Sequence, residues 1–356
     1  MMRLYLNISL SLCIGMLLSM LMVACSAEQD HEEGETLELM TYSRELADPN
    51  LKRAASVPSG YVSYTTMHPE AVGESHAVGV YLTTSPNSAV LRRFVYETDH
   101  WRSFAIVKEN TDYYIYGYMP MSAIENTTIE PVENDYSTGA YLTLEGLETF
   151  SEKDVCVVVG VKGAESVEDN VSVIPGYYYY QGKGREKNHV YLLFDHLYSA
   201  VTFSIRVASD YAAMRRIRMK SIVMKTEATE KVNARIKFEA GEASIVSVAY
   251  TPRGTTKGEC VLLDEERDLT TSYVGFGNLC YFAGAARSDM KLVSVYDVYD
   301  LEGNLLRENC VSENKLDVLS TIKSGEKRNV KLTVEPTYLH VLSDADLDMN
   351  LEIKVN

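Results

Sequence analysis

The sequence predicts an all-β protein, and three observations support this prediction. Apolar residues recur with a period of two, or in short runs rich in β-branched and aromatic residues, along most of the chain. Glycine, proline, asparagine and aspartate separate these runs, and the periodicity of long helices is scarce. The 25 tyrosines against eight phenylalanines suit strands with one wet face.

The N-terminal segment is basic at its start and apolar in its middle. Arg3 supplies one positive charge, and no charged residue occurs from Leu4 to Ala24. This run could just span a bilayer as a helix. Its position and its small-residue end are typical of a secretory signal peptide, which we predict for residues 1–24.

The residues Met22-Val23-Ala24-Cys25 resemble a bacterial lipobox, with Met22 in the place of the usual leucine. Such a motif predicts cleavage before Cys25 and acylation of its thiol. Acyl chains would anchor the protein to the outer membrane without a span, since each buried methylene contributes about 0.8 kcal/mol. An uncleaved signal anchor and ordinary secretion are the alternatives.

Residues 25–53 are predicted to be a lipidated acidic linker and propeptide. Ser26 to Glu35 carries five acids and no base, and is too poor in apolar residues to pack. An acidic stretch directly after a lipidated cysteine also resembles the signal that sends some lipoproteins to the cell surface. We therefore expect an outer-membrane lipoprotein that faces outside the cell.

The remaining chain is too long for a single sandwich, so we predict two β-domains. The stretch "QGKGREKNH" (residues 181–189) is polar and contains glycine, which places the division at 54–190 and 191–356. Predicted strands in the first part include "AVGVYLTT", "DYYIYGYMP" and "VCVVVGV"; those in the second include "AVTFSIRV", "KLVSVYDVY" and "NVKLTV". "DYAAMRR" predicts one or two helical turns.

The C-terminal residues 339–356 alternate between apolar and charged side chains, which predicts a ribbon with two unlike faces. Two interpretations are open: the ribbon closes its own sandwich, or it completes the sheet of a neighbouring chain. In the second case five side chains would fill successive pockets of the neighbour: Leu347, Met349, Leu351, Ile353 and Val355.

Four of the six cysteines lie outside the predicted signal peptide and are not the predicted lipidation site. Cys156 lies in a predicted buried strand and is expected to be a core thiol. One disulfide could form among Cys260, Cys280 and Cys310 in an oxidising compartment, and the sequence leaves the pairing open. The spacings match no zinc pattern.

Charge and motifs argue against nucleic-acid binding and against catalysis. The net charge is −16, whereas phosphate binding needs clustered lysine and arginine. The one dense basic stretch, "MRRIRMK" (residues 214–220), alternates in the manner of a strand. No GxSxG, HExxH, P-loop or dinucleotide motif occurs, so we predict no catalytic residue, metal or cofactor.

Two segments resemble the fimbrillins, the type V pilus subunits and their surface-lipoprotein relatives. They are "FDHLYSAVTFSIRVASDYAAMRRIRMKSIVMK" (Phe194–Lys225) and "WRSFAIVKENTDYYIYGYMP" (Trp101–Pro120). The resemblance implies two transthyretin-like β-sandwich domains in tandem, and a pilus, or fimbrium, in which one subunit's terminal strand fills a groove in the next. In that family an arginine-specific protease opens the groove, and here Arg53, or else Arg44, could be cut.

The competing interpretation is a monomeric surface lipoprotein that binds a glycan or another outer-membrane protein. It requires exposed aromatic side chains, for which Trp101 and the run Tyr177–Tyr180 are the candidates. In either case the partners would be other pilus subunits or a host or bacterial surface ligand. The sequence does not distinguish a stalk, tip or anchor subunit.

Overall fold

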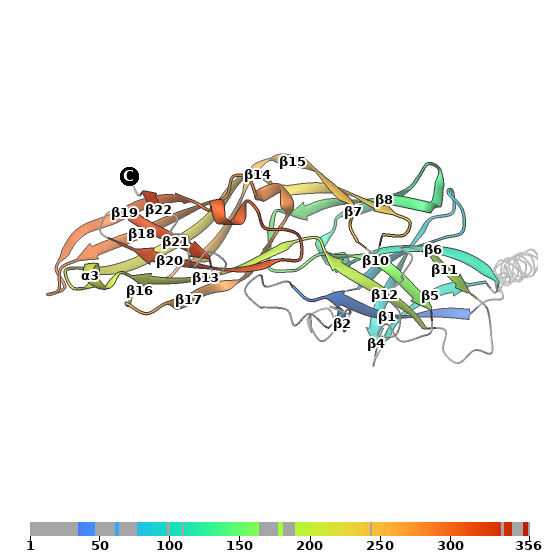
Figure 1. The fold of residues 1–356 in the computed structure, drawn as a ribbon, viewed down its shortest axis with the longest axis horizontal. Helices are drawn as coiled ribbons and strands as arrows, with labels where there is room; N and C mark the ends of the chain where they lie inside the picture. Colours follow the sequence, from blue (N-terminus) through green and yellow to red (C-terminus); the bar gives the residue numbers. More distant parts are fainter. Residues whose placement is uncertain are drawn as a thin grey trace, which may run out of the picture.

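The protein is almost entirely built of β-strands, which confirms the predicted all-β class. The computed structural model describes residues 35–46, 61–63, 77–97, 100–108, 110–163, 177–180, 189–242, 244–335, 338–343 and 352–354. Within these ranges the helices are short: η3 (Met121–Ala123), α3 (Ser209–Ala212), η5 (Gly284–Ala286) and η6 (Asp317–Leu319). The strands stack into an elongated body (Figure 1).

The N-terminal half contains a nine-stranded sheet that closes on itself. Its order is β10 (Cys156–Gly163), β12 (His189–His196), β1 (Glu35–Arg44), β5 (His100–Val107), β4 (Val90–Glu97), β3 (Val78–Thr83), β6 (Thr111–Met119) and β11 (Tyr177–Tyr180), with β2 (Tyr61–Ser63) beside β1. Because β10 also pairs with β6, the strands from β10 round to β6 form a closed ring. A closed ring has no free edge among its members.

Two further sheets are open. The six-stranded sheet has the order β22 (Glu352–Lys354), β21 (Tyr338–Ser343), β20 (Lys327–Val334), β13 (Ser199–Val207), β17 (Val274–Phe282) and β9 (Phe150–Ser151). The seven-stranded sheet has the order β19 (Leu305–Lys315), β18 (Lys291–Tyr299), β14 (Arg216–Glu239), β8 (Asp135–Glu148) and β7 (Asn126–Val132), with β15 (Ser247–Leu263) and β16 (Arg267–Asp268) on β14.

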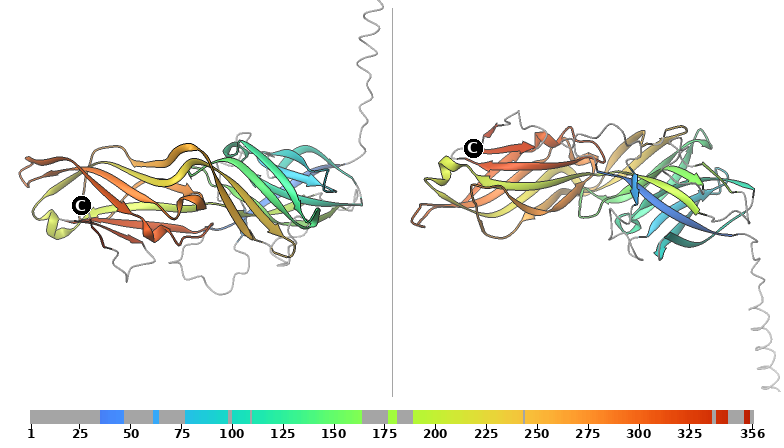
Figure 2. Two further views of the ribbon diagram at one scale, coloured as in Figure 1. Left: turned by 90° about the horizontal axis from the view of Figure 1, so that it is seen from above. Right: turned by 60° about the horizontal axis from the view of Figure 1, so that its bottom comes forward.

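Strands β14 and β15 run through both halves of the molecule. The first part of β14 pairs with β18, in the C-terminal half, and its last part pairs with β8, beside the ring. β15 follows β14 over most of this length. Figure 2 shows these strands passing from one end of the body to its middle and on toward the ring.

Three apolar cores follow from these layers. One fills the ring, with Leu37, Phe94 and Trp101 among its members. A second lies between the outside of the ring and strands β8 and β14, and a third lies between the two open sheets in the C-terminal half. Strand β10 contributes to the first two on alternate sides, which explains its uninterrupted "VCVVV" sequence, since a strand buried on both faces needs no polar positions.

Several predicted elements can be compared with this structure. α3 lies in the predicted "DYAAMRR" turn. The basic stretch enters β14, where Ile217 and Met219 are buried, Arg216 is exposed, and Arg218 and Lys220 are half-buried. The predicted division at 190/191 falls inside β12, and β12 belongs to the ring over its whole length. No helix among the described residues is long and apolar enough to cross a membrane.

Candidate functional site

Strand β1 lies in the segment predicted to be linker and propeptide, and it forms part of the ring. It runs parallel to β12, from Glu38 opposite His189 to Ser43 opposite Phe194, and antiparallel to β5. From Leu37 to Arg44 its side chains alternate as the period of two requires: the odd positions are buried, and the even ones are half-buried. The strand therefore completes the ring between β12 and β5.

Both faces of β1 contact its neighbours. On the inner face Leu37 and Leu39 are fully buried in the ring core, and the Trp101 Nε1–H donates a 2.7 Å hydrogen bond to Thr41 Oγ1. On the outer face Glu38 Oε1 lies 3.5 Å from His100 Nε2 and 3.8 Å from Arg102 Nε of β5. Apolar burial is the main attachment of β1, because partly exposed ion pairs contribute little.

The C-terminal end of β1 is held by a cluster of polar side chains, here called the Arg44 cluster: Arg44, Asp154, Cys156, Asp195 and His196. Asp154, Cys156 and His196 are buried, whereas the side chain of Arg44 is 39% exposed. Arg44 Nη1 lies 3.2 Å from Asp195 Oδ2. The His196 Nε2–H donates to the carbonyl oxygen of Arg44, and its Nδ1–H donates to the carboxylate of Asp154. Both the side chain and the carbonyl group of Arg44 are thus fixed to the ring.

The imidazole of His196 has an acceptor at each ring nitrogen, so the arrangement suits the doubly protonated form. Burial alone would lower the pKa of His196, but the charge and hydrogen bond of Asp154, the Arg44 carbonyl and Asp195 raise it above its ordinary value. Burial raises the pKa of Asp195, and Arg44 and His196 partly offset this effect. The Cys156 Sγ lies 3.4 Å from His196 Nδ1, as a core thiol.

Asp154, Cys156 and His196 are also the one group among the described residues whose ligand atoms could meet on a metal ion, since these atoms lie within 4.8 Å of one another. A structural zinc site takes four ligands, and this group offers three. His196 and Asp154 are hydrogen-bonded directly to each other. The cluster is better described as a buried ion pair with a thiol beside it.

The C-terminal ribbon lies at an edge of the six-stranded sheet. β21 pairs antiparallel with β20, from Val330 opposite Ser343 to Val334 opposite Leu339. β22, which contains Ile353, pairs with β21 and is the last strand of that sheet. Among the described strands, β22 is thus an edge strand with one hydrogen-bonded neighbour.

Most of the other predicted site residues lie outside the described ranges. They are Cys25, Arg53, Leu347, Met349, Leu351 and Val355. Arg44 is therefore the one cleavage candidate whose surroundings are described, and Ile353 is the one donor-strand residue whose strand is described. The functions predicted for all of these residues stay predictions.

The aromatic candidates of the competing interpretation differ in position. Trp101 is 1% exposed, so it cannot serve as a binding platform at the surface. Tyr177–Tyr180 form β11, paired with β6.

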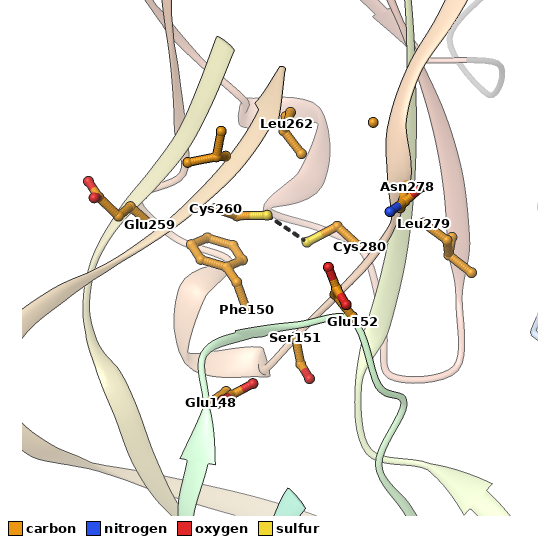
Figure 3. A pocket seen from close by; sticks show the side chains of 12 residues that line it. Glu148, Phe150, Ser151, Glu152, Glu259, Cys260, Leu262, Asn278, Leu279 and Cys280 are labelled. Carbon is orange, nitrogen blue, oxygen red and sulfur yellow. Dashed lines mark hydrogen bonds between the residues drawn. The ribbon is translucent and has the colours of Figure 1, made fainter. Parts of the chain in front are cut away.

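A pocket of about 360 Å³ opens elsewhere, between β9, β15 and β17 (Figure 3). Phe150 is its one aromatic lining residue, and Glu148, Glu152 and Glu259 make its rim acidic.

The sequence did not predict the Arg44 cluster. Its members come from three segments, and Arg44 and His196 are 152 positions apart. The available signal was indirect: Asp154 and Asp195 each stand at an end of an apolar run. A carboxylate at such a place must find a partner, because an unpaired buried charge is costly.

Comparisons with known proteins identify the fold. No family model matches the chain, and no curated protein matches it in sequence. Among solved structures it resembles a fimbrial protein from Bacteroides vulgatus, with a TM-score of 0.53 at 12% identity over 87% of this chain and 98% of that chain. This likeness confirms, at the level of the fold, the resemblance seen in the sequence.

Two other solved structures were matched with lower TM-scores. One is a fimbrial assembly protein from Parabacteroides distasonis, with a TM-score of 0.34 at 7% identity over 91% of this chain and 99% of that chain. The other is the fimbrial anchor protein Mfa2 from Porphyromonas gingivalis, with a TM-score of 0.30 at 10% identity over 90% of this chain and 100% of that chain.

Proposed function

We propose that this chain is a structural or adhesive subunit of a cell-surface pilus, exported as a lipoprotein on Cys25 and assembled by strand exchange. The fold shared with the fimbrial protein of Bacteroides vulgatus supports the class of function. The place of β1 in the ring is the observation that carries the mechanism. β1 is the first described strand of the chain and the only described strand before residue 61.

Loss of β1 would convert the closed ring into a receptor for another strand. β12 and β5 would each present an unpaired row of N–H and C=O groups, which is a template for a new strand. Removal of the Leu37 and Leu39 side chains would leave two pockets in the ring core. An incoming strand with apolar side chains at alternate positions could restore both the hydrogen bonds and the packing.

Proteolysis after Arg53, or after Arg44, would separate β1 from the body of the protein. After either cut β1 is held only by its non-covalent contacts. Arg44 lies at the end of β1 with its guanidinium paired to Asp195, so cleavage there must first release the Arg44 cluster. This requirement favours Arg53, which follows outside the strand.

The C-terminal ribbon, residues 339–356, is the proposed donor. β22 has a single neighbour in its sheet, so it can detach by breaking one strand pairing. Full burial of each donor side chain is worth roughly 1.5–3 kcal/mol. Five of them could therefore hold a stable joint despite ordering costs of about 1–2 kcal/mol per residue.

The test is the double variant Leu351→Asp with Ile353→Asp in the full-length protein. Polymers should be lost while the monomer keeps the far-ultraviolet circular dichroism and melting temperature of the wild type. The matched control is Glu352→Ser with Lys354→Ser, which alters the charged face of the same ribbon and should leave assembly intact.

Two results would contradict the donor role. Polymers that persist unchanged in the Asp variant would show that assembly does not use this strand, and would favour the surface binding module. A monomer that unfolds would show that the ribbon belongs to its own sheet.

Export and processing have separate measurements. A fatty-acid analogue should label the protein and fail to label Cys25→Ala, whereas equal labelling of both would exclude lipidation at this residue. N-terminal sequencing of assembled protein should find a start just after Arg53 or Arg44. A start at Cys25 throughout would mean that β1 stays in place.

A further inference from the structure

Two cysteines from different sheets lie in contact inside the C-terminal half of the molecule. The Sγ atoms of Cys260 and Cys280 are 3.6 Å apart (Figure 3). Cys260 lies on β15, opposite Met224 of β14 in the seven-stranded sheet. Cys280 lies on β17, opposite Val201 of β13 in the six-stranded sheet. The two thiols therefore meet between two sheets that share no hydrogen-bonded strand pair at this point.

The pair lies at the floor of the pocket between β9, β15 and β17. Cys260 is half-buried, while Cys280 is 4% exposed. A reagent that enters the pocket therefore reaches Cys260 first. The hydrogen bond from the Cys280 thiol lowers the pKa of Cys260, whereas that contact and burial raise the pKa of Cys280. Cys260 is accordingly the better nucleophile of the two, because the thiolate is the reactive form.

We propose that Cys260 and Cys280 form a disulfide that joins the two sheets of the C-terminal half. The oxidant is a small or protein disulfide, for which oxidised glutathione serves as the probe. The Cys260 thiolate attacks one sulfur of the probe, forms a mixed disulfide and releases one glutathione thiolate. Cys280 then loses its proton, attacks the Cys260 sulfur and releases the second glutathione, so that two electrons pass to the probe.

The remaining thiols do not compete for this pairing. Cys310 lies on β19, and the order β19, β18, β14, β15 puts it three strand spacings, about 14 Å, from Cys260. A disulfide needs Cα atoms within about 7 Å of each other. Cys156 lies in the ring, in contact with His196. The sequence left three pairings open among Cys260, Cys280 and Cys310, and the structure assigns one.

The disulfide would close a loop that contains the end of β15, all of β16 and most of β17. Such a cross-link reduces the conformational freedom of the unfolded chain. The melting temperature of the oxidised protein should therefore exceed that of the reduced protein by about 5 °C. The same rise in melting temperature should occur in Cys310→Ser and should be absent in Cys260→Ser. Because Cys260 is half-buried, serine should fit at this position.

Peptide mapping of the full chain provides the decisive experiment. The protein is incubated with oxidised glutathione or with a reductant, alkylated in denaturant and digested with trypsin without reduction. Trypsin cuts after Lys257, Arg267 and Arg287, so the disulfide would hold peptide 258–267 to peptide 268–287. The linked species should appear in the oxidised wild type and in Cys310→Ser, and should be absent after reduction and in Cys260→Ser.

Other outcomes would overturn the proposal. Full alkylation of both cysteines after oxidation would show that the pair does not close. A glutathione adduct that persists on Cys260, or a cross-link between Cys310 and either cysteine, would show that Cys280 is not the resolving thiol. Failure of pilus assembly in any variant would leave these readouts unaffected, because the mapping is done on the isolated chain.

Discussion

The two halves of the molecule differ in whether their sheets have free edges. In the N-terminal half the sheet closes through the pairing of β10 with β6, so none of the strands from β10 round to β6 has a free edge. In the C-terminal half both sheets are open and end on strands with one neighbour, such as β22 and β19. The proposed strand exchange would require the ring to lose β1 first, whereas β22 is held by one neighbouring strand in its sheet.

The largest effect is expected from charges placed on the inner face of β1. Leu37→Asp with Leu39→Asp replaces two fully buried leucines. Each loses roughly 1.5–3 kcal/mol of burial and adds several kcal/mol for an unpaired buried carboxylate. The ring should fail to close, and circular dichroism melting should show a transition at a much lower temperature than that of the wild type. Met40→Ser, on the outer face of the same strand, should melt as the wild type does; equal loss in both variants would mean that the strand tolerates no change.

A matched pair of cavity variants compares the cores of the two halves. Phe94→Ala lies in the ring core and Phe282→Ala lies between the open sheets, and both side chains are fully buried. Each should lower the free energy of unfolding by about 3–5 kcal/mol. Because β14 and β15 run through both halves, either variant should shift a single transition in urea. Two transitions, of which each variant moves one, would show that the halves unfold independently.

The Arg44 cluster should make the stability of the ring depend on pH. Since the pKa of His196 is raised in the folded protein, its contribution is complete below the ordinary imidazole pKa of about 6.5 and is lost as the pH rises through the folded value. The pKa of Asp195 is also raised, but its change begins near the ordinary carboxyl value of about 3.9. Urea midpoints measured upward from about pH 6.5 therefore include the contribution of His196.

Asp154→Asn is the variant that tests this pH dependence. Removal of one partner from a buried ion pair should cost about 3 kcal/mol, and the fall in stability above about pH 6.5 should flatten. A variant that is destabilised but keeps the wild-type pH profile would assign the dependence to a different group.

The smallest effect is expected at the open edge of the C-terminal half. Glu313 on β19 lies 3.1 Å from Lys291 on β18, and both side chains are partly or largely exposed. Glu313→Gln should change the free energy of unfolding by less than about 0.5 kcal/mol, because exposed ion pairs contribute little. A loss above about 1 kcal/mol in urea unfolding would mean that this edge is held as firmly as the ring.

Local patterns predicted the strands but not their partners. The alternation in "AVTFSIRV" predicted β13, and the alternating apolar positions near the start of β14 were likewise visible. Ring closure could not be predicted, because β1 pairs with β12, about 150 positions away, and period-two alternation carries no information on which strand lies beside it.

The same limit applies to the cysteines and to the candidate site. "GEC" and "NLC" give no sign that Cys260 and Cys280 meet, since their strands lie in different sheets. The sequence predicted Arg44 as a cleavage candidate, but its contacts with Asp195 and His196 depend on the ring.

The continuity of β14 has a mechanical consequence. At about 3.3 Å per residue, its 24 residues extend roughly 80 Å, and β15 lies alongside. A pull directed along the long axis would load the hydrogen bonds between these strands in shear, so that many must break together rather than one after another. Bending between the halves would require both strands to fold sharply at once. The register between β14 and β15 shifts between Lys225 and Lys231, so bending between the halves should concentrate there, while the stretch on either side should behave as a stiff rod.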